Sequence, residues 1–375
     1  MKKSLYHIGV TCFVMLSIMS CRDATVQRDH HVLDFSDVSL QKIDKRKARK
    51  NTVLSYGQID TSDNSLLRFC SFGGIKDSLF LAMDMQKILV VGIDGHVRKR
   101  IEHVGRGPNE YLQIYSSTID KEGERIFILG DYSNNLRVSV YSFSGDFLET
   151  IQLAEAGSSI CYYEKSLYYT TLPEAESLVR RIDMDKRTDV SIVSPITAKN
   201  HVKTAIINLD YLKIEDDVLV YHKALCDTLF RVSGNTLNPF LVFDLGEKSM
   251  PVEYQRTLES LNTNKANYIN IQNTTFCGGM LYMWFWYKHV LYFDIWDIQS
   301  EELVYRNYYH ERDLLTMDDS KIGLPISVNG RDMFFWPRQA DAGLLFCELS
   351  QEDANSIVPG YNPEFNQSFL LIKPE

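Results

Sequence analysis

Short apolar and aromatic runs recur along the chain at the length of β-strands, with turn residues between them and few helical periods. Many of these runs are rich in tyrosine and in β-branched residues, which pack well on a pleated surface. The clearest predicted strands are 66–72, 79–83, 87–93, 125–129, 137–143, 147–153, 158–163, 167–171, 218–221 and 228–232. The pattern predicts an all-β protein.

Turn pairs recur between these runs at a regular interval. They are Asp94-Gly95, Ser144-Gly145, Asp185-Lys186 and Ser233-Gly234, at spacings of 50, 41 and 48 residues. Propeller blades are four-stranded units of about 40–50 residues. We therefore expect a six-bladed β-propeller over residues 52–375, whose first and last strands pair to close the ring. A large β-sandwich is the alternative.

Two segments depart from the strand pattern. Residues 249–262 carry an early proline and apolar residues at 254, 258 and 261, which predicts a short helical insertion. Residues 340–349 are less β-like, and we expect a second helix there.

A glycine-rich corner, Val104–Tyr111, lies between two predicted hairpins. It is not a dinucleotide-binding fingerprint, because Glu110 stands where a third small residue is needed and strand residues follow. Glycines allow positive φ and proline fixes φ, so the corner is typical of a connection between blades. A second reading makes Arg106 and Glu110 ligand-binding groups on a channel rim.

This corner, after Asp94-Gly95, resembles the "GrGPgE-aromatic" signature of six-bladed β-propeller lipoproteins of Bacteroidetes. These belong to the TolB-like group, which includes a family named after a Bacteroides fragilis lipoprotein and is related to NHL propellers. The segment Asp227–Gly246 is similar to a second motif of that group. The resemblance covers most of the chain and implies the propeller architecture. It implies no catalytic residues.

The N-terminus reads as a bacterial export signal. Two lysines precede a short apolar stretch, and a small residue comes directly before Cys21. This pattern predicts a lipoprotein signal peptide over residues 1–20, lipidation at Cys21 and a lipid-anchored tether over residues 21–51. An ordinary signal peptide with a chance cysteine is the alternative. We expect a protein of the cell envelope, anchored at the outer membrane and facing the periplasm or the exterior.

Charge and cysteine usage exclude two classes of function. Residues 21–375 carry 38 basic and 49 acidic side chains, a net charge of −11, so nucleic acid is not an expected partner. The basic run Lys42–Lys50 reads as a solvated linker or as a contact with anionic head groups. Cysteines 70, 161, 226, 277 and 347 are scattered, which argues against a structural zinc site.

The strongest aromatic cluster is 283–289, in which Trp284 and Trp286 would share one face of a strand. It reads either as packing between blades or as a platform on which a sugar ring could stack. Trp336 has the same two interpretations, packing between blades or a stacking surface for a ligand.

The sequence therefore predicts non-catalytic binding of a ligand, a glycan or an envelope protein, without a cofactor. The candidate ligand-binding residues are Arg106, Glu110, Trp284 and Trp286. The alternative is a metal-dependent hydrolase or lyase that holds an ion, Ca²⁺ for oxygen ligands, in the central channel. A structural scaffold is a third class. No Gly-x-Ser-x-Gly elbow occurs in the sequence.

Overall fold

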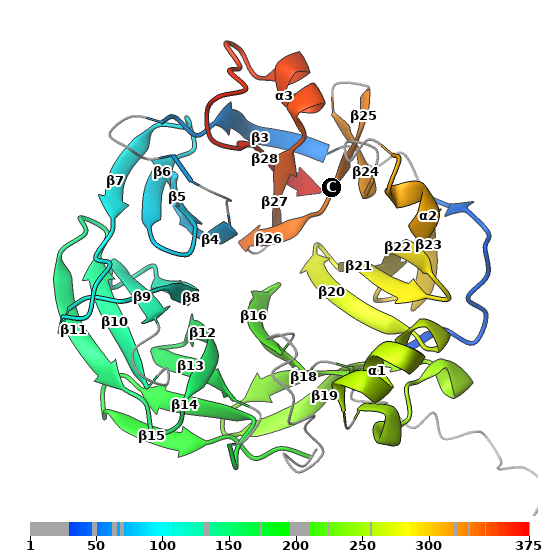
Figure 1. Ribbon diagram of the computed structural model, residues 1–375, viewed down its shortest axis with the longest axis horizontal. Helices are drawn as coiled ribbons and strands as arrows, with labels where there is room; N and C mark the ends of the chain where they lie inside the picture. The colour runs from blue at the N-terminus through cyan, green and yellow to red at the C-terminus, as the bar shows by residue number, and fades with distance from the viewer. Residues whose placement is uncertain are drawn as a thin grey trace, which may run out of the picture.

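The computed structural model describes residues 30–46, 51–61, 66–67, 71–107, 109–130, 136–172, 175–195, 210–223, 225–255, 257–317, 322–328, 331–341 and 343–374. Within these ranges, six small antiparallel sheets form a ring (Figure 1). The prediction of a six-bladed β-propeller is therefore confirmed. Each blade has an innermost strand at the axis and an outermost strand at the rim.

The first three blades each comprise four consecutive strands. Blade 1 is β4 (Ser71–Lys76), β5 (Leu79–Met83), β6 (Ile88–Gly92) and β7 (Val97–Ile101). Blade 2 is β8 (Ile114–Asp120), β9 (Arg125–Gly130), β10 (Arg137–Ser142) and β11 (Phe147–Gln152). Blade 3 is β12 (Gly157–Tyr163), β13 (Ser166–Thr171), β14 (Val179–Asp183) and β15 (Thr188–Ser191).

Blades 4 and 5 each gain a further strand from the N-terminal part of the chain. Blade 4 is β16 (Tyr211–Glu215), β17 (Val218–His222), β18 (Thr228–Ser233) and β19 (Thr236–Asp244), with β1 (His31–Asp34) parallel to β19. Blade 5 is β20 (Asn270–Cys277), β21 (Met280–Tyr287), β22 (Val290–Asp297) and β23 (Glu302–His310), with β2 (Ile43–Asp44) antiparallel to β23.

Blade 6 closes the ring. It combines β26 (Arg338–Asp341), β27 (Leu344–Leu349) and β28 (Ser368–Pro374) with β3 (Asn51–Gln58), which lies antiparallel to β28 as the outermost strand. The expected pairing of the first and last propeller strands is confirmed. A separate hairpin, β24 (Leu324–Val328) and β25 (Arg331–Phe335), precedes this blade.

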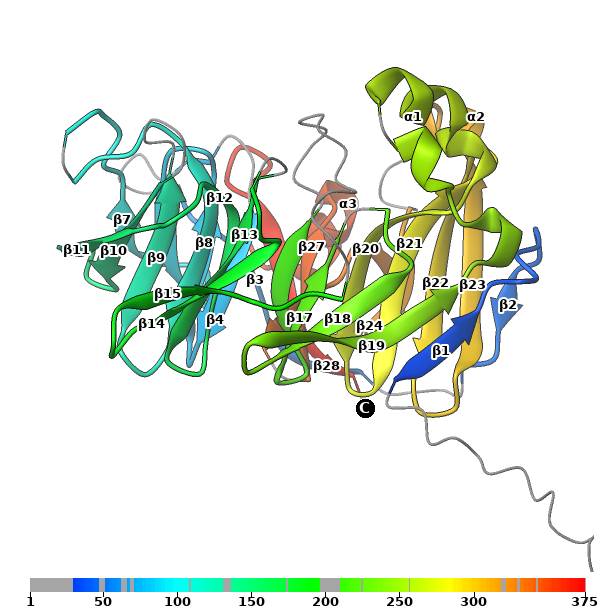
Figure 2. The same ribbon diagram turned by 90° about the horizontal axis from the view of Figure 1, so that it is seen from below.

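Helices are short and lie outside the blades. The predicted insertion is confirmed: η3 (Gly246–Lys248), η4 (Val252–Gln255), α1 (Leu258–Asn264) and η5 (Lys265–Asn267) link blades 4 and 5. Figure 2 shows α1 and α2 (Glu311–Leu314) standing beyond the same face of the disc. The helix predicted at 340–349 is wrong, because this stretch forms β26 and β27, and a helix, α3 (Gln351–Ile357), follows instead. Residues 344–349 are buried on both faces, which removes the alternation that marks a strand.

Part of the segment expected to be a free tether packs on the propeller. Leu33 and Phe35 are fully buried, and the Phe35 ring lies 5.4 Å from that of Phe285 and 5.2 Å from that of Trp296. Residues 31–44 thus run along the outside of blades 4 and 5 (Figure 2). The signal peptide, Cys21 and the end of the basic run at 47–50 lie outside the described residues.

The core is divided among the seams between blades. Each of six apolar clusters joins two neighbouring blades, as Leu129 of β9 and Leu167 of β13 do between blades 2 and 3. Because the side chains fill the seams, the innermost strands are held apart around the axis, where the central cavity lies.

Candidate functional site

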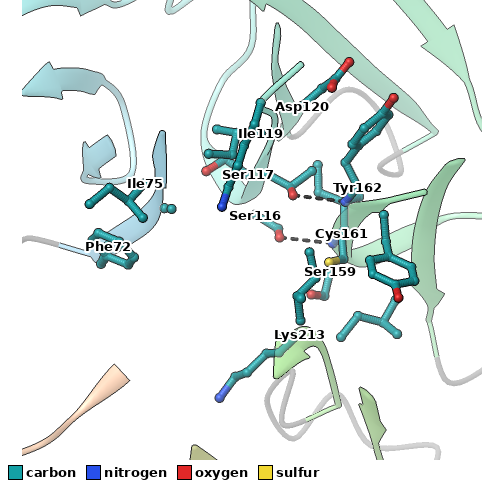
Figure 3. Close-up of a pocket in the computed structure, with 18 of the residues that line it drawn as sticks. Phe72, Ile75, Ser116, Ser117, Ile119, Asp120, Ser159, Cys161, Tyr162 and Lys213 are labelled. Atoms are coloured by element: carbon teal, nitrogen blue, oxygen red, sulfur yellow. Dashed lines mark hydrogen bonds between the residues drawn. The ribbon is translucent and has the colours of Figure 1, made fainter. Parts of the chain in front are cut away.

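A cavity of about 970 Å³ occupies the centre of the propeller. Its wall comes from the innermost strands of all six blades: β4, β8, β12, β16, β20 and the first residue of β26. Figure 3 shows Phe72 and Ile75 of β4 facing residues of β8 and β12 across this space. The innermost strands run in one direction, so their hairpin ends gather at one mouth of the cavity.

Hydroxyl groups bridge the seam between blades 2 and 3 at the wall. Ser116 Oγ accepts a hydrogen bond of 3.1 Å from the backbone N–H of Ile160. Thr118 Oγ1 accepts one of 3.0 Å from the N–H of Tyr162 (Figure 3). Alternate side chains of β8 therefore accept hydrogen bonds from the backbone N–H groups on the unpaired edge of β12, since alternate residues of a strand lie on the same side.

The seam between blades 4 and 5 is built on the same plan with ionisable groups. Lys213 Nζ of β16 donates to Asn273 Oδ1 at 2.5 Å and to the Thr274 carbonyl at 3.4 Å. Glu215 Oε2, two residues on and therefore on the same face, accepts from the Phe276 N–H at 2.8 Å. A lysine and a glutamate thus stand where β8 has a serine and a threonine.

Burial shifts the pKa values of both groups toward their neutral forms. It raises the pKa of Glu215 to about 8, against the opposing effect of the Lys213 charge and the Phe276 N–H. It lowers the pKa of Lys213 to about 8, where Glu215 opposes the shift and Arg338 adds to it. Glu215 is 2% exposed, and its Oε1 has no hydrogen-bond partner in the part of the chain that the structure describes. Perturbed groups of this kind mark candidate functional sites.

Tyrosines add aromatic surface to the wall. Tyr115, Tyr162 and Tyr163 all line the cavity. The Tyr162 ring is stacked on Phe127 at 5.2 Å, and the Tyr163 hydroxyl donates to the Asp217 carbonyl at 2.8 Å. Tyr115 is 41% exposed, so its ring offers a surface to a ligand.

The four ligand-binding residues expected from sequence do not line this cavity. Glu110 Oε2 accepts a hydrogen bond of 2.6 Å from the Gly107 N–H, and the carboxylate fills the space beside Gly105, where an added Cβ would lie 2.0 Å from it. Glu110 therefore fixes the corner between β7 and β8, and Arg106 is exposed on that corner.

Trp284 and Trp286 share a face of β21, as expected, and that face packs on the apolar cluster between blades 5 and 6. Both are half-buried, and Trp284 lies edge-on to Trp336 with ring centroids 4.9 Å apart. Packing between blades thus accounts for this aromatic cluster. The structure places the two tryptophans and the Arg106–Glu110 corner on different blades.

Sequence reasoning missed Tyr115, Lys213, Glu215 and Arg338. The alternation Tyr211-x-Lys213-x-Glu215 would have signalled two ionisable groups on one strand face. It precedes the predicted strand at 218–221 and was not assigned to a strand.

The described thiols and possible metal ligands are scattered through the structure. Cys161, Cys226, Cys277 and Cys347 are free thiols, and burial raises the pKa of Cys161 to about 12, which disfavours the reactive thiolate. Among the described residues, no three His, Cys, Asp or Glu side chains come together as metal ligands.

These features define a six-bladed β-propeller with a polar and aromatic central cavity. Residues 54–361 match the family described as Domain of unknown function (DUF4934), and the chain belongs to this family. No curated protein matches the chain.

Two solved structures of Bacteroides proteins match this chain. A candidate exported protein of Bacteroides fragilis NCTC 9343 is 14% identical, with a TM-score of 0.66 over 92% of this chain and 99% of that one. A protein of unknown function from Bacteroides thetaiotaomicron VPI-5482 is 10% identical, with a TM-score of 0.48 over 88% of this chain and 76% of that one. At this identity the first likeness concerns the fold alone.

Proposed function

We propose that this propeller is a non-catalytic binding protein that takes a polyhydroxylated ligand, a glycan, into its central cavity. The observation that carries the proposal is the composition of the wall: exposed aromatic surface at Tyr115 stands among hydroxyl, amide and charged groups on the innermost strands. A volume of about 970 Å³ suits a ligand of a few sugar rings.

The cavity wall offers both kinds of contact that a sugar makes, ring stacking and hydrogen bonding. The apolar face of a sugar ring stacks on an aromatic ring, as tyrosine provides at low cost in conformational entropy. Sugar hydroxyls both donate and accept, and the wall offers acceptors and donors in Ser117, Ser159 and Asn273. The competing hydrolase or lyase reading needs several ligands converging on one ion, and it has no such set in the described ranges.

Binding is tested with a matched pair of tyrosines. Tyr115 is 41% exposed in the cavity, and Tyr56 is 42% exposed on β3 at the rim. A glycan panel screened by saturation-transfer NMR identifies a ligand, and calorimetry then compares Tyr115→Ala with Tyr56→Ala. We expect at least a tenfold loss of affinity for the first, on the order of 1.4 kcal/mol, and none for the second. Equal affinities in both variants would place the ligand elsewhere.

We further propose that the protein is exported and held at the cell envelope by a lipid on Cys21. Support comes from the lipobox-like sequence and from the candidate exported protein of similar fold. No described helix is long and apolar enough to cross a membrane. Radiolabelled palmitate should enter the wild-type protein and not Cys21→Ala, which should leave the membrane fraction. If the wild-type protein takes up no label and Cys21→Ala stays in the membrane fraction, the lipid anchor is refuted.

A further inference from the structure

Two cationic side chains face the cavity from blades that are not neighbours. Lys213 lies on β16 of blade 4, and Arg338 is the first residue of β26 in blade 6. The positive charge of Arg338 acts on Lys213, helping to lower its pKa, so the two groups are close enough to repel each other. Folding brings these like charges to one wall.

Neither cation has a carboxylate ion-pair partner among the described residues. The hydrogen-bond acceptors of Lys213 are the neutral Asn273 side chain and the Thr274 carbonyl. Three arginines with half-buried or buried side chains are paired with carboxylates: Arg125 with Asp120, Arg180 with Asp189 and Arg306 with Asp294. At the cavity wall, by contrast, Lys213 and Arg338 have no carboxylate within ion-pair distance among the described residues.

Two carboxyl groups lie near the cations, Glu215 by Lys213 and Glu348 by Arg338. Burial raises the pKa of both, against the effect of the neighbouring cation. Each also has one buried oxygen without a hydrogen-bond partner in the described chain. Lys213 is half-buried and Arg338 is exposed, and both line the cavity. Two cations on one wall favour an anion from solution.

The hairpin mouth of the cavity carries charges of both signs. Glu122, Glu164 and Asp217 lie exposed at the hairpin ends of β8, β12 and β16 and line the cavity there, as do the exposed Lys121 and Lys165. Arg338, the first residue of β26, and Lys213, midway along β16, both precede the hairpin ends of their strands and line the cavity inward from this mouth.

We propose that the ligand is an acidic sugar whose carboxylate is bound by Arg338 and Lys213. This inference rests on the proposed glycan-binding function and narrows it. A guanidinium offers a planar fork of donors that matches a carboxylate, and an ammonium adds a point charge beside it. The aromatic and hydroxyl groups of β8 and β12 then hold the ring.

The test compares digalacturonic acid with its dimethyl ester, in which both carboxyl groups are esterified, so that the rings are the same and the charge is absent. Calorimetry should show that the wild-type protein binds the acid at least tenfold more tightly than the ester, as expected for one charge-assisted contact. Arg338→Gln and Lys213→Gln should each lose about this factor for the acid and leave the ester unchanged. Lys213→Arg, which keeps the charge, should retain the preference.

Controls separate the possible failures. Lys99→Gln removes an exposed charge from β7 at the rim and should bind both forms like the wild type. Melting temperatures of all variants report whether they fold. Equal binding of acid and ester would overturn the inference and leave the glycan-binding function standing. Failure of the folded wild-type protein to bind either form would count against both.

Discussion

Glu215 Oε2 accepts a hydrogen bond of 2.8 Å from the backbone N–H of Phe276, across the seam between blades 4 and 5. Thr118 performs the same task between blades 2 and 3, with a bond of 3.0 Å to the Tyr162 N–H. One neutral hydroxyl is sufficient for this bridge. Glu215 brings a second carboxyl oxygen that is buried without a partner among the described residues, an arrangement that costs stability and points to function.

Replacing Glu215 by glutamine should flatten the dependence of stability on pH. The pKa of Glu215 is raised to about 8 in the folded protein, from 4.5. The folded state therefore binds more protons in this window, and the wild-type protein loses stability as pH rises from 4.5 to 8, with a limiting slope of about 1.4 kcal/mol per pH unit. Urea unfolding at pH 5, 6.5 and 8 measures this slope.

Glu215→Ala serves as the control, because it leaves the Phe276 N–H without an acceptor. Relative to Glu215→Gln it should cost about 1–3 kcal/mol at every pH in that series, because neither variant titrates at this position. Parallel stability profiles for the wild type and Glu215→Gln would contradict the assigned titration.

Acid should destabilise the protein through His222, which is 2% exposed. Its Nε2–H donates to the Cys226 carbonyl at 3.1 Å, and burial lowers its pKa to about 4, with Lys213 adding to the shift. Because the folded pKa is depressed from 6.5, the unfolded state binds more protons between pH 6.5 and 4, and up to roughly 3 kcal/mol is lost as pH falls through that window.

His222→Gln keeps a donor for the Cys226 carbonyl and removes the titration. Its unfolding free energy should change less between pH 7 and 4.5 than that of the wild type. Identical acid sensitivity in the wild type and His222→Gln would refute the role of His222.

Two glycines with positive φ should respond differently to alanine. Gly95 has φ +86°, and an added Cβ would lie 2.3 Å from the Gln58 carbonyl oxygen of the closing strand β3. Gly234 has φ +58° with open space around it. Both substitutions cost about 1–2 kcal/mol for the backbone conformation, and Gly95→Ala adds about 1–3 kcal/mol of overpacking. Thermal melting that shows equal losses would contradict this account.

Single substitutions in the buried pair Asp294–Arg306 should lower the stability of the protein strongly. The guanidinium donates to both carboxylate oxygens, at 2.8 and 2.5 Å, and the side chains are 0% and 2% exposed. Asp294→Asn leaves a buried charge and should cost about 3–5 kcal/mol. Asp294→Leu combined with Arg306→Met should recover part of that loss in denaturant unfolding. A double variant less stable than either single variant would show that the pair contributes net stability.

The sequence predicts the repeat well because its turns carry local signals. Asp94-Gly95, Ser144-Gly145, Asp185-Lys186 and Ser233-Gly234 all prove to lie between the third and fourth strands of their blades. A tight turn with positive φ restricts residue choice wherever it occurs, as at Gly95 and Gly145. The sequence also predicts that Trp284 and Trp286 share one face of a strand, but it does not show which blade that face packs against.

The cavity could not be predicted, because it depends on distant segments meeting. Tyr115, Lys213 and Arg338 lie on three blades, and each is unremarkable in its local sequence. Strand β1 was missed for a related reason, since its parallel pairing with β19 joins residues about two hundred positions apart. Glu110 drew attention as a conspicuous residue of the corner, where it holds a turn.

The most direct test of the cavity as the ligand site is a crystal structure of residues 22–375 soaked with digalacturonic acid. We predict electron density for the sugar in the central cavity, with a ring against Tyr115 and a carboxylate within hydrogen-bond distance of Arg338 and Lys213. Density on the Arg106 corner, or beside Trp284 and Trp286 with an empty cavity, would contradict the account.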